Sequence, residues 1–462
     1  MSEPLPPARN RGLVRDLDAS HAIAIVVGTV IGTGIFLVPA EMMQAAGKAS
    51  TVYLAWITGG LLSFFGALTY AELGAMQPEA GGEYVYMRDA YGPLGGFLYA
   101  WTTFLISKPG SIATIATGIV RILGTFKAMA FFVRSEPGHS LTLTGRLVAI
   151  LLTVVVSAIN FTGVRRAGAF QVVFTALKVG LVFAVIVIAF SWHGGSWVNF
   201  STVFSGAKGG LAGYMIALVA ALWAYDGWNN LNMVAGEIRR PGRNVPMALI
   251  AGVGLVALLY IAVNAAVQYV MPAPLIAASA RPASDAVSIV LGTAAASAIA
   301  AFMAVQMIAT LNGAILSGAR IPFAVAADGY FFHFLARIHP RFHTPSAAIL
   351  LQQSLVVLLL LFGGNFQQLF SLTLFAEWLF YMLTAATVFI FRVRRPGATR
   401  PYRTWGYPVV PGVFIAASAV LLYGTFTANI VNSALGILVI LAGVPVYFAF
   451  ARRTGLARIG SR

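Results

Sequence analysis

The chain alternates between long apolar runs and short polar segments that are rich in charge, glycine or proline. Each apolar run is long enough to cross the hydrocarbon core of a bilayer as an α-helix, which takes about 20 residues. The runs at 94–123 and 285–320 exceed this length, so tilted helices or helices that extend beyond the lipid are expected there. The pattern predicts an all-α polytopic membrane protein of about twelve transmembrane helices. The predicted spans are 21–46, 50–76, 94–123, 143–162, 167–191, 210–236, 245–270, 285–320, 346–362, 366–391, 409–429 and 433–451.

The composition indicates that lipid, rather than water, is the main solvent of this chain. Apolar residues make up 59% and charged residues 10%, and the mean hydropathy is +0.84, whereas soluble domains carry about 25% charged residues. Segment 1–20 is polar and basic, and it lacks the apolar region and small-residue cleavage site of a signal peptide. We therefore expect residues 1–20 to form a cytoplasmic N-terminal segment, and the first apolar run to remain as a helix.

The basic residues are distributed asymmetrically between the two sides of the predicted spans. The net charge of +16 would indicate nucleic-acid binding in a soluble protein. With the N-terminus inside, 21 of the 30 lysines and arginines fall in inside segments and 6 in outside segments. The remaining three, Lys108, Arg121 and Lys178, lie within spans. This bias predicts that both termini are cytoplasmic and explains the charge without nucleic acid. We expect Lys108, Arg121 and the acidic Glu72 to lie near span ends or to be paired within the bundle.

Two segments on the predicted cytoplasmic side have a composition that is unusual for a simple connecting loop. Pro78–Pro93 combines glycine, tyrosine and charge, and Asp328–Pro345 carries aromatic residues, three histidines and two arginines. Each is predicted either to form a short interfacial or re-entrant helix or to be an ordinary structured loop. The histidines do not have the spacing of metal ligands, so no metal site is expected.

The first apolar run contains a cluster of glycines where a helix would cross the middle of the membrane. Gly28, Gly32 and Gly34 lie within it, and Pro39 follows. An unwound turn at 31–35 would expose backbone N–H and C=O groups, which must line a cavity or bind a ligand because lipid cannot satisfy them. The N–H groups would favour an anion and the carbonyls a cation, and a zwitterionic amino acid offers both. The alternative interpretation is close helix packing through a small-xxx-small pattern. A dinucleotide site is excluded, because Leu37 replaces the third glycine of GxGxxG.

The sixth apolar run is interrupted in a similar way by Tyr-Asp-Gly-Trp-Asn-Asn at 225–230. Five spans separate this interruption from the first one. Transporters with inverted repeats place two broken helices at corresponding positions, where they flank a site near the middle of the membrane. The pair of interruptions therefore predicts a transporter more strongly than either does alone.

Four segments together resemble the amino acid–polyamine–organocation superfamily and, within it, the L-type amino-acid transporter family. They are GTVIGTGIF (28–36), EAGGEYVYMRDAYG (79–92), LWAYDGWNNLN with GEIRRPGRNVP (222–246), and LNGAILSGARIPFAVAADG (311–329). The resemblance implies a fold of five plus five helices with broken helices 1 and 6, as in LeuT-like transporters. The transport core would be 21–391, with repeats 21–191 and 210–391, followed by two further helices at 409–451 and a cytoplasmic tail at 452–462. It also implies that amino acids are exchanged or taken up by alternating access.

The resemblance also assigns substrate-binding residues. Backbone groups of Ile31, Gly32, Thr33 and Gly34 would hold the carboxylate and amino group of an amino acid. Trp223 would close over the substrate from outside. The side-chain pocket would be lined by Ala224, Asp226, Gly227 and Asn230, with Trp378 approaching it.

Lys178 lies in the middle of the otherwise apolar fifth span. A charged group inside a membrane is costly and is a functional hypothesis by default. In the L-type family, a lysine in this region resembles a tethered cation at the place where related transporters bind sodium. It would pair with carbonyls of the first break and with a polar group of the eighth span, such as Ser317, and transport would be sodium-independent. The alternative is a lysine that extends to the membrane interface.

Two intramembrane acids leave several roles open. Asp226 could accept a cationic substrate side chain or a proton. It could instead cap the second half of the broken helix. Glu377, next to Trp378, is a candidate proton-coupling group.

Other function classes lack a supporting pattern. No GxSxG, HExxH or Walker A motif appears, so an enzyme is not indicated and no cofactor is expected. A channel would be expected to show repeated filter loops around a symmetric pore. In animals, relatives in the resembled family are linked by a disulfide to a heavy chain, but this chain has no cysteine. We therefore expect a stand-alone carrier in a bacterial inner membrane, and the main alternative is a proton-coupled symporter of amino acids or polyamines. The sequence does not indicate the amino acid carried or the oligomeric state.

Overall fold

The computed structural model describes residues 12–32, 34–134, 141–279, 281–362, 366–428 and 430–453. Apart from three isolated β-bridges, the regular structure in this part of the chain is helical. The first elements are α1 (Ala19–Val30), α2 (Gly34–Ala46), α3 (Ala49–Met76), α4 (Glu83–Tyr91), α5 (Pro93–Thr102), η1 (Thr103–Ser107), α6 (Lys108–Leu123), η2 (Lys127–Phe132), α7 (Leu143–Phe161), α8 (Val164–Phe190) and η3 (Trp197–Ser201). They are followed by α9 (Gly210–Ala224), α10 (Asn230–Met233), η4 (Ala235–Glu237), α11 (Pro241–Val270), α12 (Ala273–Ala278), α13 (Pro282–Leu291), α14 (Thr293–Gly318), α15 (Arg320–Ala327), η5 (His333–Ala336), α16 (Ser346–Phe362), α17 (Phe366–Arg394), α18 (Val409–Ala428) and α19 (Ile430–Arg453).

The helices agree with the twelve predicted spans. Among the described residues, nine helical segments are long and apolar enough to cross a membrane. The other three predicted spans contain the shorter apolar helices α1, α9 and α16. The chain is therefore a multi-pass membrane protein, as predicted. One difference is that the predicted span 285–320 contains two helices, because Gly292 adopts a positive φ of 87° and ends α13 before α14 begins.

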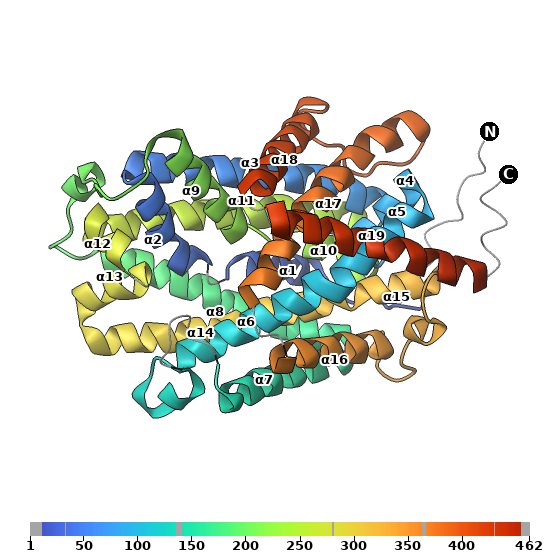
Figure 1. The fold of residues 1–462 in the computed structure, drawn as a ribbon, viewed down its shortest axis with the longest axis horizontal. Helices are drawn as coiled ribbons and strands as arrows, with labels where there is room; N and C mark the ends of the chain where they lie inside the picture. The colour runs from blue at the N-terminus through green and yellow to red at the C-terminus, as the bar shows by residue number, and fades with distance from the viewer. Residues whose placement is uncertain are drawn as a thin grey trace.

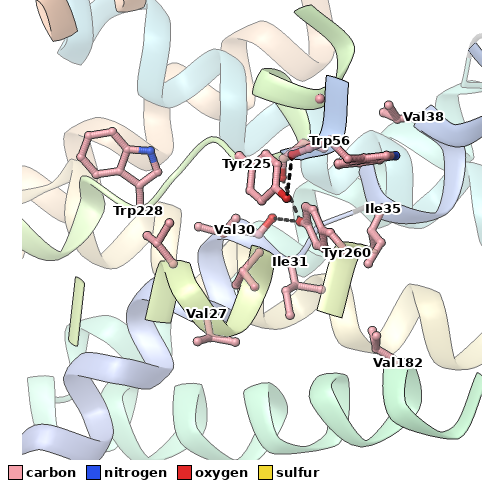
Figure 2. Packing of buried hydrophobic residues seen from close by; sticks show 14 of the residues in the cluster. Val27, Val30, Ile31, Ile35, Val38, Trp56, Val182, Tyr225, Trp228 and Tyr260 are labelled. Carbon is pink, nitrogen blue, oxygen red and sulfur yellow. Dashed lines mark hydrogen bonds between the residues drawn. The ribbon is translucent and has the colours of Figure 1, made fainter. Parts of the chain in front are cut away.

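Most of the long helices run along the long axis of the molecule, with α1 and α10 near the middle of the view (Figure 1). The helix α1 packs against α8, α11 and α14, and α2 packs against α9. The last two helices lie outside this centre, since α18 packs on α17 and α3, and α19 on α5 and α17. The buried apolar side chains around α1, α2, α9 and α11 form the largest core cluster (Figure 2).

Both predicted helix breaks are present, and they contact each other. Helix α1 ends at Val30 and α2 begins at Gly34, while α9 ends at Ala224 and α10 begins at Asn230. Gly227 lies in the second break with φ of +105°, a conformation that L side chains rarely adopt. The Thr29 hydroxyl donates a hydrogen bond of 3.0 Å to the Gly227 carbonyl.

The two ends of the bundle differ in their loops. We call the end that carries α4, α15 and η5 the basic end, because Arg88, Arg165, Arg239 and Arg337 lie there. The opposite end carries η2, η3 and α12. Of the two segments singled out in the sequence, 78–93 contains the helix α4, whereas 328–345 is mostly an irregular loop with the short turn η5. Glu72 is paired, as expected, with Arg392 at 2.7 Å at the same end.

Candidate functional site

A cavity of about 370 Å³ lies where the two helix breaks meet. Both breaks contribute to its wall, together with side chains from α6, α14 and α17. Of the residues predicted for the site, the cavity is lined by Gly32, Gly34, Trp223, Ala224, Asp226, Gly227, Asn230 and Glu377. Thr33 lies outside the described residues. The cavity therefore combines main-chain groups of two broken helices with ionisable side chains.

The first break presents the N-terminus of α2 to this cavity. The first four N–H groups of an α-helix have no partner within the helix, and they carry the positive end of its dipole. Gly34 is packed so closely that a Cβ atom there would lie 3.0 Å from both Cα and Cβ of Ala224. Glycine at this position lets the two breaks approach each other and leaves room for a small anion at the start of α2.

Tyr260 on α11 connects the carbonyl ends of α1 and α9. Its buried hydroxyl lies 3.0 Å from the Val30 carbonyl oxygen and 2.9 Å from that of Ala224. Figure 2 shows this ring between the two breaks, with Trp56 and Tyr225 beside it. The hydroxyl supplies a donor to carbonyl groups that the helix ends leave unpaired.

Lys178 is fully buried on α8 and donates to the first break. Its Nζ atom lies 2.7 Å from the Gly28 carbonyl oxygen and 2.8 Å from Oγ1 of Thr310, and it also contacts the Ile31 carbonyl. The side chain does not extend to an interface, and the expected pairing with carbonyls of the first break is present. The terminal amino group of Lys178 therefore occupies the oxygen cluster formed by α1 and α14.

The prediction that Ser317 is the partner of Lys178 on α14 is wrong, because Thr310 contacts Lys178 instead. Ser317 lies seven residues further along α14, which is about 10 Å along a helix axis. Its hydroxyl donates instead to Oδ1 of Asn230 at 3.0 Å. Both residues face inward on α14, so the sequence alone did not reveal which of them reaches the depth of Lys178.

Lys108 is a cavity residue that was not among the predicted site residues. It is buried, lines the cavity and donates to Oδ1 of Asn230, the first residue of α10. It directly follows the π-helical turn η1, and such turns are frequent at functional sites. A lysine inside the apolar span 94–123 was the sequence feature that could have indicated a cavity residue. The expectation that Lys108 is paired within the bundle is confirmed.

Two carboxylates of the cavity wall share one phenol. The Tyr381 hydroxyl lies 2.8 Å from Oδ1 of Asp226 and 3.2 Å from Oε1 of Glu377. Tyr381 and Glu377 are four residues apart on α17 and therefore share a face of that helix. The cap interpretation of Asp226 is wrong, since the N-cap of α10 is Asn229 and that end has no side-chain cap hydrogen bond.

Trp378 does not line the cavity, contrary to expectation. Its ring packs against Tyr381 and Phe414, with centroid distances of 5.7 and 6.3 Å. Successive residues on a helix point in directions about 100° apart. Because Glu377 faces the cavity, its neighbour Trp378 is directed toward α18.

Among the described residues, the cavity lining extends toward one end of the bundle. It begins at Ser107, the last residue of η1, and follows α6 from Lys108 to Ile122, toward the end that carries η2. At the basic end, Arg320 and Glu237 form a fully buried ion pair with an Nε–Oε1 distance of 2.7 Å. The main-chain N–H of Leu17, before α1, donates a hydrogen bond of 3.0 Å to the carbonyl of Glu237. The carbonyl of Leu17 accepts a hydrogen bond of 2.7 Å from the N–H of Arg239. None of the described residues that line the cavity belongs to α4, α15 or η5 at the basic end.

Comparisons with known proteins agree with this geometry. The family described as "Amino acid permease" matches residues 17–450. The serine/threonine exchanger SteT of Bacillus subtilis (strain 168) is 30% identical over 449 residues, which cover 96% of this chain and 98% of that protein. The b(0,+)-type amino acid transporter 1 of Homo sapiens is 31% identical over 452 residues, covering 96% and 89%. The cystine/glutamate transporter of Homo sapiens is 28% identical over 447 residues, covering 96% and 87%.

These matches span nearly the whole chain and include both helix breaks. They also confirm the resemblance to L-type transporters that the four sequence segments indicated. The chain therefore belongs to the amino acid permease family of the amino acid–polyamine–organocation superfamily, and it is a membrane transporter rather than an enzyme.

Proposed function

We propose that this chain exchanges amino acids across a bacterial inner membrane by alternating access and without sodium. The observation that carries the proposal is the position of the Lys178 ammonium group, which lies among the carbonyl oxygens of the first break and the Thr310 hydroxyl. A cation that is covalently attached to the protein would supply the positive charge there. Transport then needs no dissolved cation at that position.

The substrate would bind at the cavity between the breaks. Its α-carboxylate would accept hydrogen bonds from main-chain N–H groups at the start of α2, near Gly32, Thr33 and Gly34. Its amino group would be held by carbonyl groups at the ends of α1 and α9. Trp223 would cover the substrate from the side of the open route. Recognition of groups that all α-amino acids share leaves the choice of side chain to the rest of the cavity.

The acidic side of the cavity would select the substrate side chain. Asp226 and Glu377 lie on one wall, linked through Tyr381, and Lys108 lies nearby on α6. A cationic side chain would form a charge-assisted hydrogen bond with Asp226. The relatives have names that include serine, threonine, cystine and glutamate, so the family accommodates different side chains.

Proton-coupled symport of amino acids or polyamines is the second candidate. The observation that favours it is the same pair of carboxylates, because two acids that share one hydrogen-bond donor can exchange a proton when the substrate arrives. In that case Glu377 and Asp226 would be coupling residues.

We also propose an organisation of the chain that supports alternating access. Repeat 21–191 would contain α1 to α8 and repeat 210–391 would contain α9 to most of α17, each beginning with a broken helix. Helices in 409–451 would lie outside the transport core, and 1–20 and 452–462 would be cytoplasmic. The concentration of arginines at one end supports the cytoplasmic assignment of that end.

The test is uptake of a labelled amino acid into proteoliposomes that are either empty or preloaded with unlabelled amino acids. Sodium is replaced by choline in one arm, and a proton gradient is applied in another. We expect uptake only into preloaded vesicles, unaffected by both gradients. Lys178→Ala should abolish it, while Lys208→Ala, which changes an exposed lysine of the loop before α9, should not. Uptake into empty vesicles that follows the proton gradient would contradict exchange and favour proton-coupled symport. A requirement for sodium would contradict the proposed role of Lys178.

A further inference from the structure

A second cavity lies at the basic end, away from the substrate site. It has a volume of about 600 Å³ and lies at the corner between α7 and α8. Three arginines line it, namely Arg165 and Arg166 at the start of α8 and Arg341 in the loop after η5. Its wall contains no acidic residue, and among the described residues none of these arginines forms an ion pair. The cavity therefore concentrates positive charge that nothing in the described part of the chain neutralises.

The loop that carries Arg341 is fastened to this corner. The Thr344 hydroxyl donates a hydrogen bond of 2.9 Å to the carbonyl of Phe161, the last residue of α7. The rings of Phe161, His339 and Phe342 pack together, with centroid distances between 4.6 and 5.9 Å. This hydrogen bond and the ring packing thus fix the loop so that Arg341 lies opposite Arg165 and Arg166.

The surface next to the cavity is apolar and faces outward. Helix α7 lies at the edge of the bundle in Figure 1. Val154 and Val155 on α7, and Val173 and Leu177 on α8, are between 43% and 56% exposed. Exposed apolar faces of this kind on membrane-spanning helices are covered by lipid acyl chains. The arginines therefore stand where the apolar face ends, at the level at which lipid headgroups lie.

We propose that this cavity binds the phosphate headgroup of an anionic phospholipid. Arginine recognises phosphate through paired N–H groups, and basic pockets between membrane helices on the cytoplasmic side are suited to anionic headgroups. The acyl chains would lie along the exposed faces of α7 and α8. A free phosphate ion would satisfy the arginines but would leave this apolar face without a role, so the lipid is the ligand that matches both features. The headgroup would also join the α7–α8 corner to the loop 339–344, two segments that are far apart in the sequence.

The test measures lipid binding to the purified full chain by native mass spectrometry. Dioleoylphosphatidylglycerol is titrated, and dioleoylphosphatidylcholine with the same acyl chains serves as the neutral comparison. The variant R165Q/R166Q/R341Q is compared with R243Q/R337Q/R403Q, which removes the same charge from three exposed arginines of the basic end that do not line the cavity. Elution volume and apparent Tm show whether each variant is folded.

We expect the cavity variant to bind phosphatidylglycerol about a hundredfold more weakly, and the control variant to change affinity less than about fivefold. Should the triple variant not fold, R341Q alone, at an exposed loop position, is expected to weaken binding about fivefold. Equal losses in both triple variants would show general surface attraction and overturn the proposal. Equal binding of phosphatidylcholine would also overturn it, as would displacement of the lipid by inorganic phosphate, which would identify a site for small anions.

Discussion

The hydroxyl group of Tyr260 lies 3.0 Å from the carbonyl oxygen of Val30, and the same hydroxyl lies 2.9 Å from the carbonyl of Ala224. One side chain of α11 thereby holds the ends of both broken helices. Tyr260→Phe removes this single donor, which the two buried carbonyl groups share, and its loss costs about 1–3 kcal/mol. We expect the apparent Tm to fall by about 2 °C or more and the exchange rate to decrease. Tyr214→Phe, which removes a hydroxyl that bonds to Thr58 instead, is the control and should leave exchange unchanged.

The partner of Lys178 can be identified by comparing two substitutions on α14. Thr310→Val removes a hydroxyl that contacts the ammonium group at 2.8 Å. Because a hydrogen bond to a charged group contributes about 1.5–3 kcal/mol, we expect exchange to fall about tenfold or more. Ser317→Ala removes neutral hydrogen bonds to Asn230 and to the Ala314 carbonyl and should have a smaller effect. Initial rates in proteoliposomes measure both, and a larger loss for Ser317→Ala would contradict the assignment.

Gly34 is expected to tolerate no side chain. A Cβ atom there would lie 3.0 Å from two atoms of Ala224, so Gly34→Ala must push the two breaks apart. Overpacking of this kind costs about 1–3 kcal/mol, and we expect substrate affinity to fall about tenfold. Gly180→Ala on α8 is the matched control, because no atom within 4 Å would meet its Cβ. Competition by unlabelled substrate measures the affinity, and an unchanged affinity in Gly34→Ala would argue against binding at this break.

We expect Asp226 to distinguish substrates by the charge of their side chains. In the variant Asp226→Asn, we expect inhibition of uptake by lysine to weaken about tenfold more than inhibition by leucine, since only lysine loses a charge-assisted hydrogen bond. Glu377→Gln is compared in the same assay. An equal effect on lysine and leucine in Asp226→Asn would assign that residue to coupling or structure instead of selectivity.

Asp18 links the stability of α1 to pH. It is the N-cap of α1, and the hydrogen bond from the Ser20 hydroxyl keeps the pKa of this carboxyl well below its ordinary value of 3.8. A lowered pKa in the folded state means that the stabilisation is complete above the ordinary value and is lost as pH falls through the folded value. We expect Asp18→Ala to lower the apparent Tm at pH 7, and the difference from wild type to shrink as the pH falls below 3.8. A difference that does not depend on pH would contradict this origin.

Hydropathy was sufficient to predict the spans, because the bilayer requires long apolar helices. The breaks at 31–35 and 225–230 could also be predicted, because glycine and polar residues in the middle of a membrane have few structural explanations. The choice between Thr310 and Ser317, and the orientation of Trp378, depend on how each helix is rotated and how deep it lies. These properties are determined by packing against neighbouring helices, and no single segment of sequence contains them. Lys108 was missed as a cavity residue because its role depends on Asn230, which lies 122 positions away.

The main-chain pairing of Leu17 with Glu237 and Arg239 has a consequence for the effect of substitutions at the basic end. Both of these hydrogen bonds join peptide groups, so they do not depend on the side chain at position 17, except that proline would lack the N–H donor. Substitutions of Leu17 other than proline are therefore expected to preserve this main-chain connection. We expect any opening of that end during transport to break both main-chain hydrogen bonds of Leu17 and to separate the buried Glu237–Arg320 pair.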